Sequence, residues 1–435
     1  MSPIKQLPTK LADWLDYIEA LHPKSIEMGL DRVNIVKQRL NLQLDFPVII
    51  VGGTNGKGST CAMLEHIYHA AGYRVGAYSS PHLLRYNERV RLSKQEIPDE
   101  ALIAAFTQIE YARQDTELTY FEFGTLAAVL YFVAQKIDVA ILEVGLGGRL
   151  DAVNAFEPDC TIITSIDLDH MEFLGDTRES IGAEKAGIFR ANIPAICGDD
   201  NPPVTLIEKA KQVNAELNLI GHQFNVQKKS GAEASKIKSW SYQYKNTILD
   251  DLPEPALTGD FQLNNAACVL TAIQSLQSRL PVNISAIKTG LSKVKLAGRF
   301  QCWSQHPEVI LDVAHNPHAA KSLADNLAKS KPQGKTIAVF AMLADKDMAG
   351  VIKALAQEID VWYIAGIQHP RGANASLMTQ VIKSQLPQAH IKSFKQVADA
   401  FQQACIESNE NDRIIALGSF FTVAEVMQAL ESKKS

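Results

Sequence analysis

The chain has 435 residues, of which 46% are hydrophobic and 21% are charged. This length and composition are typical of a globular protein of two or three domains, and they exclude a disordered, collagen-like or coiled-coil chain. The 43 basic and 48 acidic residues give a formal net charge of -5, which argues against nucleic acid as a partner.

The start of the chain and its cysteines predict a cytoplasmic protein. The first residues lack the apolar core of a secretory signal, and the longest apolar run, residues 126–134, is far shorter than the roughly 20 residues that span a bilayer. None of the six cysteines is spaced as a metal-binding or redox pair, so we expect buried free thiols. We also expect no membrane contact and, because nothing indicates a dimer seam, a monomer.

The first part of the chain alternates short apolar runs with helical patterns, which is typical of a mostly parallel α/β sheet. Strands are expected in the apolar runs that begin at residues 47, 74, 138, 160 and 193. Helices are expected over 59–71, from 98 onward, and over 123–135, 265–276 and 284–294. Between about 222 and 251, aromatic residues alternate with polar ones, which indicates a small antiparallel β insertion.

The last third of the chain predicts a second, Rossmann-like α/β domain. Five apolar runs, VILDVA, TIAVFAM, VWYIAG, HIKSF and RIIALGS, are separated by helical patterns, as in a parallel sheet. We place the boundary after residue 296, which gives domains over 1–296 and 297–435. The cleft between two such domains is the default location of a ligand site.

The strongest local motif is a phosphate loop, GGTNGKGST, at residues 52–60. It lies between an expected strand and an expected helix, so its backbone N–H groups and the helix dipole can face phosphate oxygens. Lys57 supplies a full positive charge, and Ser59 or Thr60 can reach a Mg²⁺ ion. The motif departs from the strict pattern at two points: Val51 stands where the first glycine would be, and Gly58 intervenes before Ser59. It predicts ATP or GTP binding, but a switch protein, a kinase or a ligase can carry it.

Polar clusters stand where expected strands end, which is where open α/β sheets bind ligands. Residues 79–82 read SSPH, and Asp169 with His170 follows another strand. Glu143 lies inside an apolar strand, where a carboxylate is costly unless it is paired or bound to a metal. An ion pair with Arg149 is the structural alternative for Glu143, and an ordinary structural histidine is the alternative for His170.

Lys185 and several residues of the second domain are further candidates. Lys185 could hold phosphates as a cation, carry a carbamate, or be an ordinary solvated helix lysine. The second-domain candidates are Arg299, Asp312, His315, Asn316, His318 and Ser419. Asn316 precedes a proline and predicts a helix start, so ordinary helix capping is the alternative for Asn316 and Ser419.

Together these motifs resemble the folylpolyglutamate synthase family, within the Mur-ligase-like ATP-dependent amide ligases. They occur in the family's order from Gly52 to Phe420, so the resemblance covers nearly the whole chain. The matching segments are GGTNGKGST, SSPHLLRYNERVRL, TYFEFGTLA, ILEVGLGGRLDAVN, SIDLDHMEFLG, EKAGIFR, AGRFQ, DVAHNPHA and GSF. The segment LHPKSIEMGLDRV further resembles the bifunctional bacterial members of the family.

The resemblance implies a P-loop ATPase domain followed by a glutamate-ligase domain, and it assigns roles to individual residues. The implied ATP-binding residues are Thr54, Asn55, Gly56, Lys57, Gly58, Ser59, Thr60, Asn265, Arg299 and Asp312. The implied metal ligands are Ser80, Glu143 and His170. The implied pterin-substrate residues are Ser25, Ile26, Glu27, Met28, Thr119, Tyr120, Phe121, Glu122, Leu150, Asp151 and Ala152. Arg89, His315 and Ser419 are candidates for binding glutamate. The implied catalytic residues are Lys57, His170, Lys185 and His315, with Lys185 carbamylated.

The activity implied by the resemblance is ATP-dependent ligation of L-glutamate to 7,8-dihydropteroate and to reduced folates through an acyl phosphate. The implied cofactors are ATP and Mg²⁺, and a second divalent ion or K⁺ is left open. The alternatives are a monofunctional polyglutamylase, a related ligase for an acid such as a peptidoglycan precursor, and a non-enzymatic P-loop switch. The segments FEFGTLA and SPHLLRYNER favour folate, and a switch has no need of the polar residues in the second domain.

Overall fold

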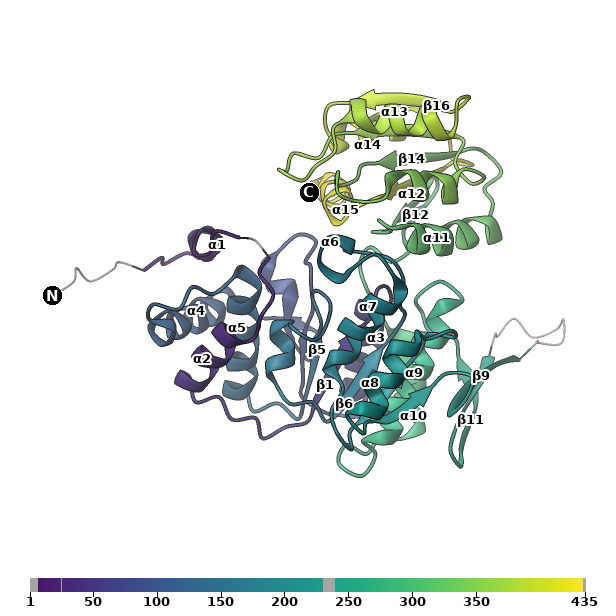
Figure 1. Ribbon diagram of the computed structural model, residues 1–435. Helices are drawn as coiled ribbons and strands as arrows, with labels where there is room; N and C mark the ends of the chain where they lie inside the picture. The colour runs from purple at the N-terminus through teal and green to yellow at the C-terminus, as the bar shows by residue number, and fades with distance from the viewer. Residues whose placement is uncertain (1–6, 25, 230–238, 433–435) are drawn as a thin grey trace. The chain divides into compact units, whose positions relative to one another are not determined.

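The computed structural model describes residues 7–24, 26–229 and 239–432, which fold into two compact α/β units (Figure 1). The first unit contains the chain up to residue 256 together with 263–294, and the second contains 257–262 together with the chain from 295 onward. The α/β fold class predicted from the sequence is confirmed in both units.

An eight-stranded sheet forms the centre of the first unit. Its strands lie in the order β4 (Gln95–Glu96), β3 (Val90–Leu92), β2 (Val75–Tyr78), β5 (Val139–Glu143), β1 (Val48–Gly52), β6 (Cys160–Ile163), β7 (Pro194–Cys197) and β8 (Glu216–Leu219). The strands from β2 to β8 in this order are parallel, whereas β3 and β4 form an antiparallel edge. The carboxyl ends of β1, β5 and β6 therefore meet at the same edge of the sheet.

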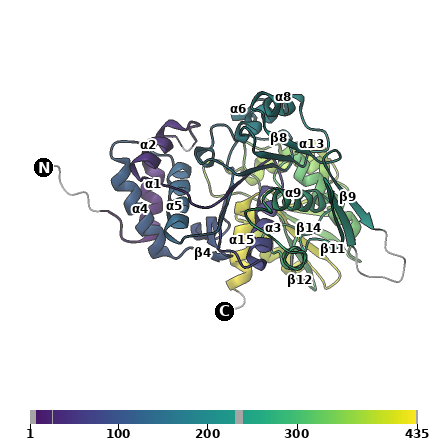
Figure 2. The ribbon, with the colours of Figure 1, turned by 90° about the horizontal axis from the view of Figure 1, so that it is seen from below.

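Helices cover both faces of this sheet, which explains why β1 and β5 are wholly buried. Figures 1 and 2 show four helices gathered on one side: α1 (Leu11–Ala20), α2 (Asp31–Arg39), α4 (Asp99–Arg113) and α5 (Tyr120–Ala134). The other side carries α3 (Lys57–Ala70) and α10 (Ile284–Lys293), with α9 (Phe261–Ser275) beside them. The connections contain α6 (Met171–Leu174), α7 (Arg178–Lys185), α8 (Val204–Gln212), η1 (Tyr86–Arg89), η2 (Ala152–Ala155) and η3 (Ala186–Ile188).

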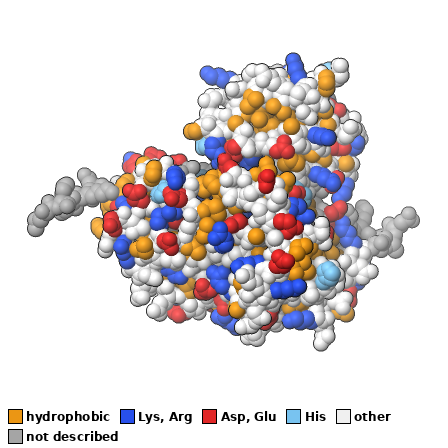
Figure 3. Space-filling model, in the orientation of Figure 1, with side chains coloured by type: hydrophobic (Ala, Val, Ile, Leu, Met, Phe, Trp, Pro, Cys, Tyr) orange, Lys and Arg blue, Asp and Glu red, His pale blue; other side chains and the backbone are white. Residues whose placement is uncertain are grey.

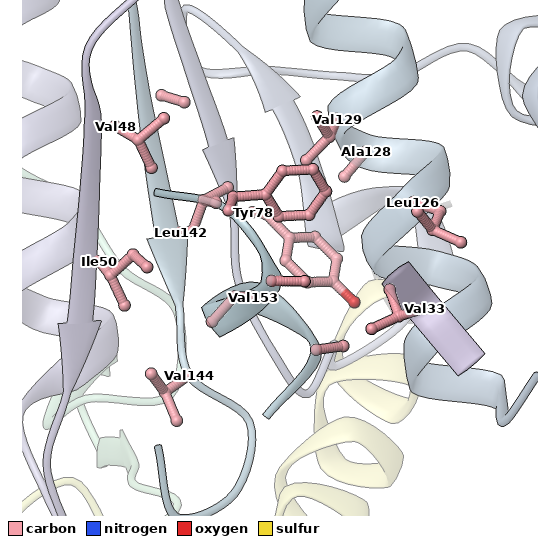
Figure 4. Close-up of a cluster of buried hydrophobic side chains, with 14 of the residues drawn as sticks. Val33, Val48, Ile50, Tyr78, Leu126, Ala128, Val129, Leu142, Val144 and Val153 are labelled. Carbon is pink, nitrogen blue, oxygen red and sulfur yellow. The ribbon is translucent and has the colours of Figure 1, made fainter. Parts of the chain in front are cut away.

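The core between α5 and the sheet is built from apolar side chains of both (Figure 4). From the sheet come Val48, Ile50, Tyr78 and Leu142, and from the helix come Leu126, Ala128 and Val129. The helix is apolar around most of its circumference because it lies between the sheet and the outer helices α2 and α4.

The predicted β insertion is confirmed as an antiparallel sheet of β9 (Phe224–Lys229), β10 (Ser239–Tyr244) and β11 (Thr247–Pro253). Trp240 and Tyr242 are fully buried and alternate with partly exposed serines, as the aromatic–polar pattern requires. The hydroxyl of Tyr242 lies 2.9 Å from Thr271 Oγ1 and so joins the insertion to α9.

The second unit contains a six-stranded sheet. Its order is β12 (Gln301–Gln305), β13 (Glu308–Leu311), β17 (Arg413–Leu417), β14 (Thr336–Phe340), β15 (Val361–Ala365) and β16 (His390–Phe394). The five predicted strands of this unit are parallel. In this unit the sequence analysis missed only the antiparallel edge strand β12, whose residues are mostly polar. The helices are α11 (Pro317–Lys329), α12 (Met348–Leu355), α13 (Ala375–Gln385), α14 (Val397–Glu407) and α15 (Phe420–Ser432).

The cysteines and the surface bear on expectations from the sequence about thiol burial and net charge. All six cysteines are free, but Cys302 is exposed and Cys405 is half-buried, so the prediction of burial is wrong for these two. Figure 3 shows acidic and basic side chains interspersed on the visible face, as the small net charge suggests. In the described parts of the chain, no helix is both long enough and apolar enough to cross a bilayer.

We predict that Gly290→Ala destabilises the first unit. A Cβ added to Gly290 of α10 would lie 2.7 Å from Ile67 Cα and 2.8 Å from Ile67 N on α3, and backbone cannot move aside cheaply. Urea denaturation should show a loss of about 1–3 kcal/mol in the free energy of unfolding, more than the higher helix propensity of alanine returns. Ser285→Ala, on the exposed side of α10, is the control, and equal stability of the two variants would contradict this packing.

Candidate functional site

The phosphate loop leads from β1 into α3 and requires glycine at two positions. Gly56 has φ +90°, and a Cβ there would lie 2.7 Å from Asn265 Oδ1. Gly53 has φ +140°, and a Cβ there would clash with Thr164. Both conformations are ones that other residues rarely adopt. The close approach to Gly56 places Asn265 of α9 against the loop.

Residues that follow β6 fix the backbone of the loop. The N–H groups of Thr54 and Asn55 donate to Ser165 O (2.7 Å) and Ser165 Oγ (3.1 Å). Thr164 Oγ1 in turn donates to Asn55 O (2.6 Å). The sequence analysis did not select Thr164 and Ser165, although two adjacent hydroxyls at the end of an apolar strand are a usable signal.

The ammonium group of Lys57 lies over the loop. It donates to Gly53 O (2.9 Å) and to Thr54 O (3.1 Å). The side chains of Ser59 and Thr60 are buried at the start of α3. Thus the structure places the positive charge of Lys57 at the mouth of the loop, where a phosphate group can replace the backbone carbonyls as its partner.

Lys185 is buried at the end of α7, with only 5% of its surface exposed, so the alternative of a solvated helix lysine is wrong. Burial, and then the charge of Lys57, lower the pKa of Lys185 to about 7, while Asp169 and Asp151 oppose this shift. A substantial fraction of Lys185 is therefore a neutral amine at physiological pH. These interactions also place Lys185 within electrostatic reach of the phosphate loop.

The three proposed metal ligands belong to neighbouring strand ends. Glu143, at the end of β5, is buried, and its Oε2 accepts from Ser80 N (3.2 Å). Arg149 donates through Nη2 and Nε to Glu184 Oε1 (2.7 and 2.9 Å), so Glu184 compensates the charge of Arg149. His170 has φ +51°, a strained backbone conformation that is enriched at functional sites. Its backbone N–H donates to Asp169 Oδ1 (2.9 Å).

Within the described residues, no three side chains of His, Cys, Asp or Glu are grouped as a metal site. The proposed set instead combines a hydroxyl, a carboxylate and an imidazole, so this observation leaves the metal prediction untested. The oxygen donors of this set suit Mg²⁺ or Mn²⁺, whereas an imidazole is a more usual ligand of transition metals.

A buried ion pair that the sequence analysis missed holds the segment before Ser80. Arg91 donates through Nε to Glu65 Oε2 on α3 (3.0 Å) and through Nη1 to Ser79 Oγ (2.8 Å). Only 2% of the Glu65 side chain is exposed. The pair therefore connects the phosphate-loop helix to the strand end that carries Ser80.

The segments assigned to the pterin substrate come together, apart from Ser25, which lies outside the described residues. Gly29 N, next to Met28, donates to Leu150 O (3.3 Å). A Cβ on Gly145 would lie 2.7 Å from Phe121 Cζ. Residues 26–28, 119–122 and 150–152 are thus neighbours in the first unit, although they are far apart in the sequence.

Asp151 is the titratable group at the centre of these segments. Its carboxylate accepts from the N–H groups of Gly145 (3.0 Å), Leu146 (2.9 Å) and Val153 (3.0 Å). Burial nevertheless raises its pKa to about 6, and the hydrogen bonds and Lys57 oppose the rise. Asp151 therefore shapes the glycine-rich turn after β5 and also lies within the electrostatic field of the phosphate loop.

Arg89, proposed to bind glutamate, also lies beside these segments. Its guanidinium is 5.3 Å from the ring centre of Tyr86 and 5.6 Å from that of Tyr120, and its Nε donates to His82 Nδ1 (2.8 Å). Burial, and then the charge of Arg89, lower the pKa of His82 to about 4, so His82 is a neutral acceptor. Two aromatic rings and one imidazole thus fix the orientation of the guanidinium.

In the second unit, the candidate residues gather at the ends of the paired strands β13 and β17. Asp312 accepts from Phe300 N (2.7 Å) and Ala314 N (2.8 Å), and burial raises its pKa against the opposing charge of Arg299. The guanidinium of Arg299 lies 5.2 Å from the ring centre of Phe420. The Phe420 ring is also 6.3 Å from the imidazole of His315.

The capping alternatives for Asn316 and Ser419 are confirmed as structural roles. Asn316 Oδ1 accepts from Ala319 N (2.9 Å) at the start of α11, as the Asn–Pro pair predicts. Ser419 Oγ accepts from Thr422 N (3.0 Å) at the start of α15.

Comparison with known proteins identifies similar domains over most of the chain. The Mur ligase middle domain matches residues 51–273, and the glutamate ligase domain of Mur ligases matches residues 298–420. The chain is 44% identical over 431 residues to dihydrofolate synthase/folylpolyglutamate synthase of Escherichia coli K12, covering 99% of this chain and 98% of that protein.

Solved structures show the same similarity. The structure of E. coli FolC in complex with DHPP and ADP has 44% identity and a TM-score of 0.91, covering 98% of this chain and 99% of that one. A bifunctional folylpolyglutamate synthase/dihydrofolate synthase with Mn, AMPPNP and L-glutamate bound has 45% identity and a TM-score of 0.89, covering 98% and 100% of the two chains.

We predict that Gly56→Ala weakens nucleotide binding while Gly52→Ala does not. Alanine at position 56 has to adopt φ +90° and displace Asn265, whereas a Cβ on Gly52 has no heavy atom closer than 3.5 Å. Fluorescence titration with a labelled ADP should show at least about a tenfold loss of affinity for Gly56→Ala, the effect of roughly 1.4 kcal/mol of strain. Equal affinities of the two variants would show that the left-handed conformation is not needed for binding.

Proposed function

Because the chain belongs to the dihydrofolate synthase/folylpolyglutamate synthase family of Mur ligases, we propose that it joins L-glutamate to 7,8-dihydropteroate and to reduced folates at the expense of ATP. The observation that carries this proposal is the placement of Lys57 and Lys185 beside Asp151 and the three first-substrate segments. The phosphate loop and the segments proposed to bind the acid thus belong to one unit, which supports this function.

A carboxylate does not react with an amine at neutral pH because its oxygen is a poor leaving group. In the proposed mechanism, the carboxylate of dihydropteroate, or of the terminal glutamate of a folate, attacks the γ-phosphoryl group of ATP. The products of this step are an acyl phosphate and ADP. The amine of L-glutamate then attacks the acyl carbon, releases phosphate and loses a proton to form the amide.

The phosphate loop positions ATP for the first step. Lys57 exchanges its bonds to the carbonyls of Gly53 and Thr54 for phosphate oxygens, where its charge stabilises the transferring group. We propose that Ser80, Glu143 and His170 hold Mg²⁺, which neutralises negative charge on the phosphates. Asn265, Arg299 and Asp312 are the proposed contacts to the remainder of the nucleotide.

Lys185 is proposed to act as a carbamate. Its neutral amine attacks the carbon of CO₂, so that an N–C bond forms while one C=O π bond becomes a carboxylate oxygen, and the nitrogen releases one proton to water. A neutral amine thus becomes an anion. The anion relieves the repulsion between Lys185 and Lys57. It would also provide a further oxygen ligand for the proposed metal ion. The lowered pKa of Lys185 supports this role because only the unprotonated amine reacts.

The incoming glutamate is proposed to bind through Arg89, His315 and Ser419. Arg89 is suited to a carboxylate because its planar guanidinium can donate two parallel hydrogen bonds, and the rings of Tyr86 and Tyr120 hold it in place.

We also propose that the protein works as a cytoplasmic monomer, and light scattering of the purified enzyme should give a mass near 47.8 kDa.

Phosphate release from MgATP tests the proposed function. Purified protein is assayed with dihydropteroate and with tetrahydrofolate, each with and without L-glutamate. Release that requires glutamate with both acceptors supports the bifunctional activity. Release with tetrahydrofolate alone identifies a monofunctional polyglutamylase, and release with neither removes the folate assignment. Release that ignores both acceptor and glutamate indicates a nucleotide switch.

We predict that Lys57→Ala and His170→Ala each lower turnover at least about 100-fold, the scale for losing one group that stabilises developing charge. The readout is steady-state phosphate release at saturating substrates. The exposed Lys211 provides a control, because Lys211→Ala removes a lysine far from the loop in sequence and should retain full turnover. Near-normal turnover of either site variant would remove that residue from the catalytic group.

We predict that carbamylation of Lys185 increases as the pH rises through about 7. With a pKa of about 7, roughly 90% of the side chain is neutral at pH 8, against under about 1% of an ordinary lysine. Carbon-13 NMR in labelled bicarbonate should show a protein carbamate that Lys185→Gln lacks and Lys211→Gln retains. A signal that persists in Lys185→Gln would assign the carbamate elsewhere.

The same pKa shift predicts how stability depends on pH when CO₂ is removed. The unfolded chain binds a proton at Lys185 up to about pH 10.5, whereas the folded chain releases it near pH 7. The unfolded state therefore binds more protons between these values, and the free energy of unfolding should rise with pH across this window. Lys185→Gln should flatten this dependence in urea denaturation, and an unchanged slope would show that Lys185 keeps an ordinary pKa.

A further inference from the structure

Arg32, near the start of α2, contacts two of the three segments assigned to the first substrate. Its Nε donates to Glu122 Oε2 (3.2 Å), and its Nη2 lies 3.1 Å from Glu122 Oε1. The same Nη2 donates to the backbone carbonyl of Glu27 (2.7 Å). One guanidinium thus bridges residues 26–28 and 119–122. Arg32 lies within the quoted segment LHPKSIEMGLDRV, but the sequence analysis assigned no role to it.

The Glu122 side of this bridge is buried. Only 4% of the Glu122 side chain is exposed, and its Oε2 also accepts from Thr119 N (2.8 Å) at the start of α5. A buried carboxylate costs several kcal/mol unless it is paired with a cation. Arg32 supplies that cation, so the conformation of residues 119–122 depends on the bridge.

The Glu27 side of the bridge extends to the third segment. The Glu27 carboxylate lies 3.1 Å from His22 Nε2 and 3.8 Å from Arg32 Nη1. Two residues further on, Gly29 N donates to Leu150 O, which joins this strip of chain to residues 150–152. Arg32 is therefore linked, directly or through residues 27–29, to all three segments.

We infer that Arg32 is a positioning residue that holds the three segments together as one binding surface for the pteroate part of the first substrate. This inference rests on the proposed function, because the segments are substrate-binding only in that function. Arginine is needed because a planar guanidinium can contact a carboxylate and a backbone carbonyl at once. A lysine at this position keeps the charge but lacks the geometry.

The test compares Arg32→Gln and Arg32→Lys with Arg39→Gln. Arg39 is on the same helix and donates in a similar way to the Arg113 carbonyl (2.7 Å) and Thr116 Oγ1 (3.2 Å), but it contacts none of the three segments. Dihydropteroate binding is measured by its fluorescence in the presence of ADP, alongside the KM values for ATP, glutamate and dihydropteroate.

We expect Arg32→Gln to weaken dihydropteroate binding and raise its KM about 10- to 100-fold, the effect of misplacing a binding surface by about 1 Å. Arg32→Lys should recover part of this loss. The KM values for ATP and glutamate, and ADP affinity, should stay within about twofold, as should all constants of Arg39→Gln. This pattern separates a positioning role from general loss of structure.

A double variant isolates the contact. Glu122→Gln keeps an oxygen for Thr119 N but removes the charge, so Arg32→Gln combined with Glu122→Gln should bind no more weakly than the weaker single variant. Dihydropteroate affinity of Arg32→Gln equal to that of Arg39→Gln would overturn the inference while wild-type turnover stands. Absence of wild-type turnover with dihydropteroate and folates would instead remove the proposed function.

Discussion

Two lysine amines, Lys57 and Lys185, share one partly desolvated corner of the first unit, and the rest of the site depends on this arrangement. Neither burial nor the neighbouring positive charge favours a protonated Lys185, and Asp169 and Asp151 compensate only in part. Such a corner attracts anions. Phosphate groups and a carbamate are both anions, so the positive charge of Lys57, which disfavours the lysine cation at position 185, favours the two groups that the proposed reaction needs.

The parallel sheet is what brings these groups to one place. Val51 pairs with Glu143 on β5, and Gly52 pairs with Ile163 on β6, so the phosphate loop, the buried carboxylate and the hydroxyls of Thr164 and Ser165 leave the sheet at the same level. Segments separated by about a hundred positions in the sequence thus become neighbours.

Local sequence motifs predicted the parts of the structure that depend on residues close together in the chain. The glycine-rich loop, the Asn316 helix start and the alternating aromatic residues of the insertion each follow from a few neighbouring residues. The ion pairs Arg32–Glu122 and Arg91–Glu65 did not follow, because their partners lie 90 and 26 residues apart and any of many charges could have paired. The edge strand β12 was missed for a related reason: a short polar strand carries little hydrophobic pattern, which also explains the exposure of Cys302.

The antiparallel insertion lies far from the phosphate loop in sequence, yet the two are mechanically connected. Tyr242 is bound to Thr271 of α9, and the same helix places Asn265 against Gly56. A local opening of α9 would have to break the buried Tyr242 contact as well as the helix itself, so we expect the insertion and α9 to open together. The residue that contacts Gly56 of the phosphate loop is thereby stabilised by a small β-sheet that is remote from the loop in sequence.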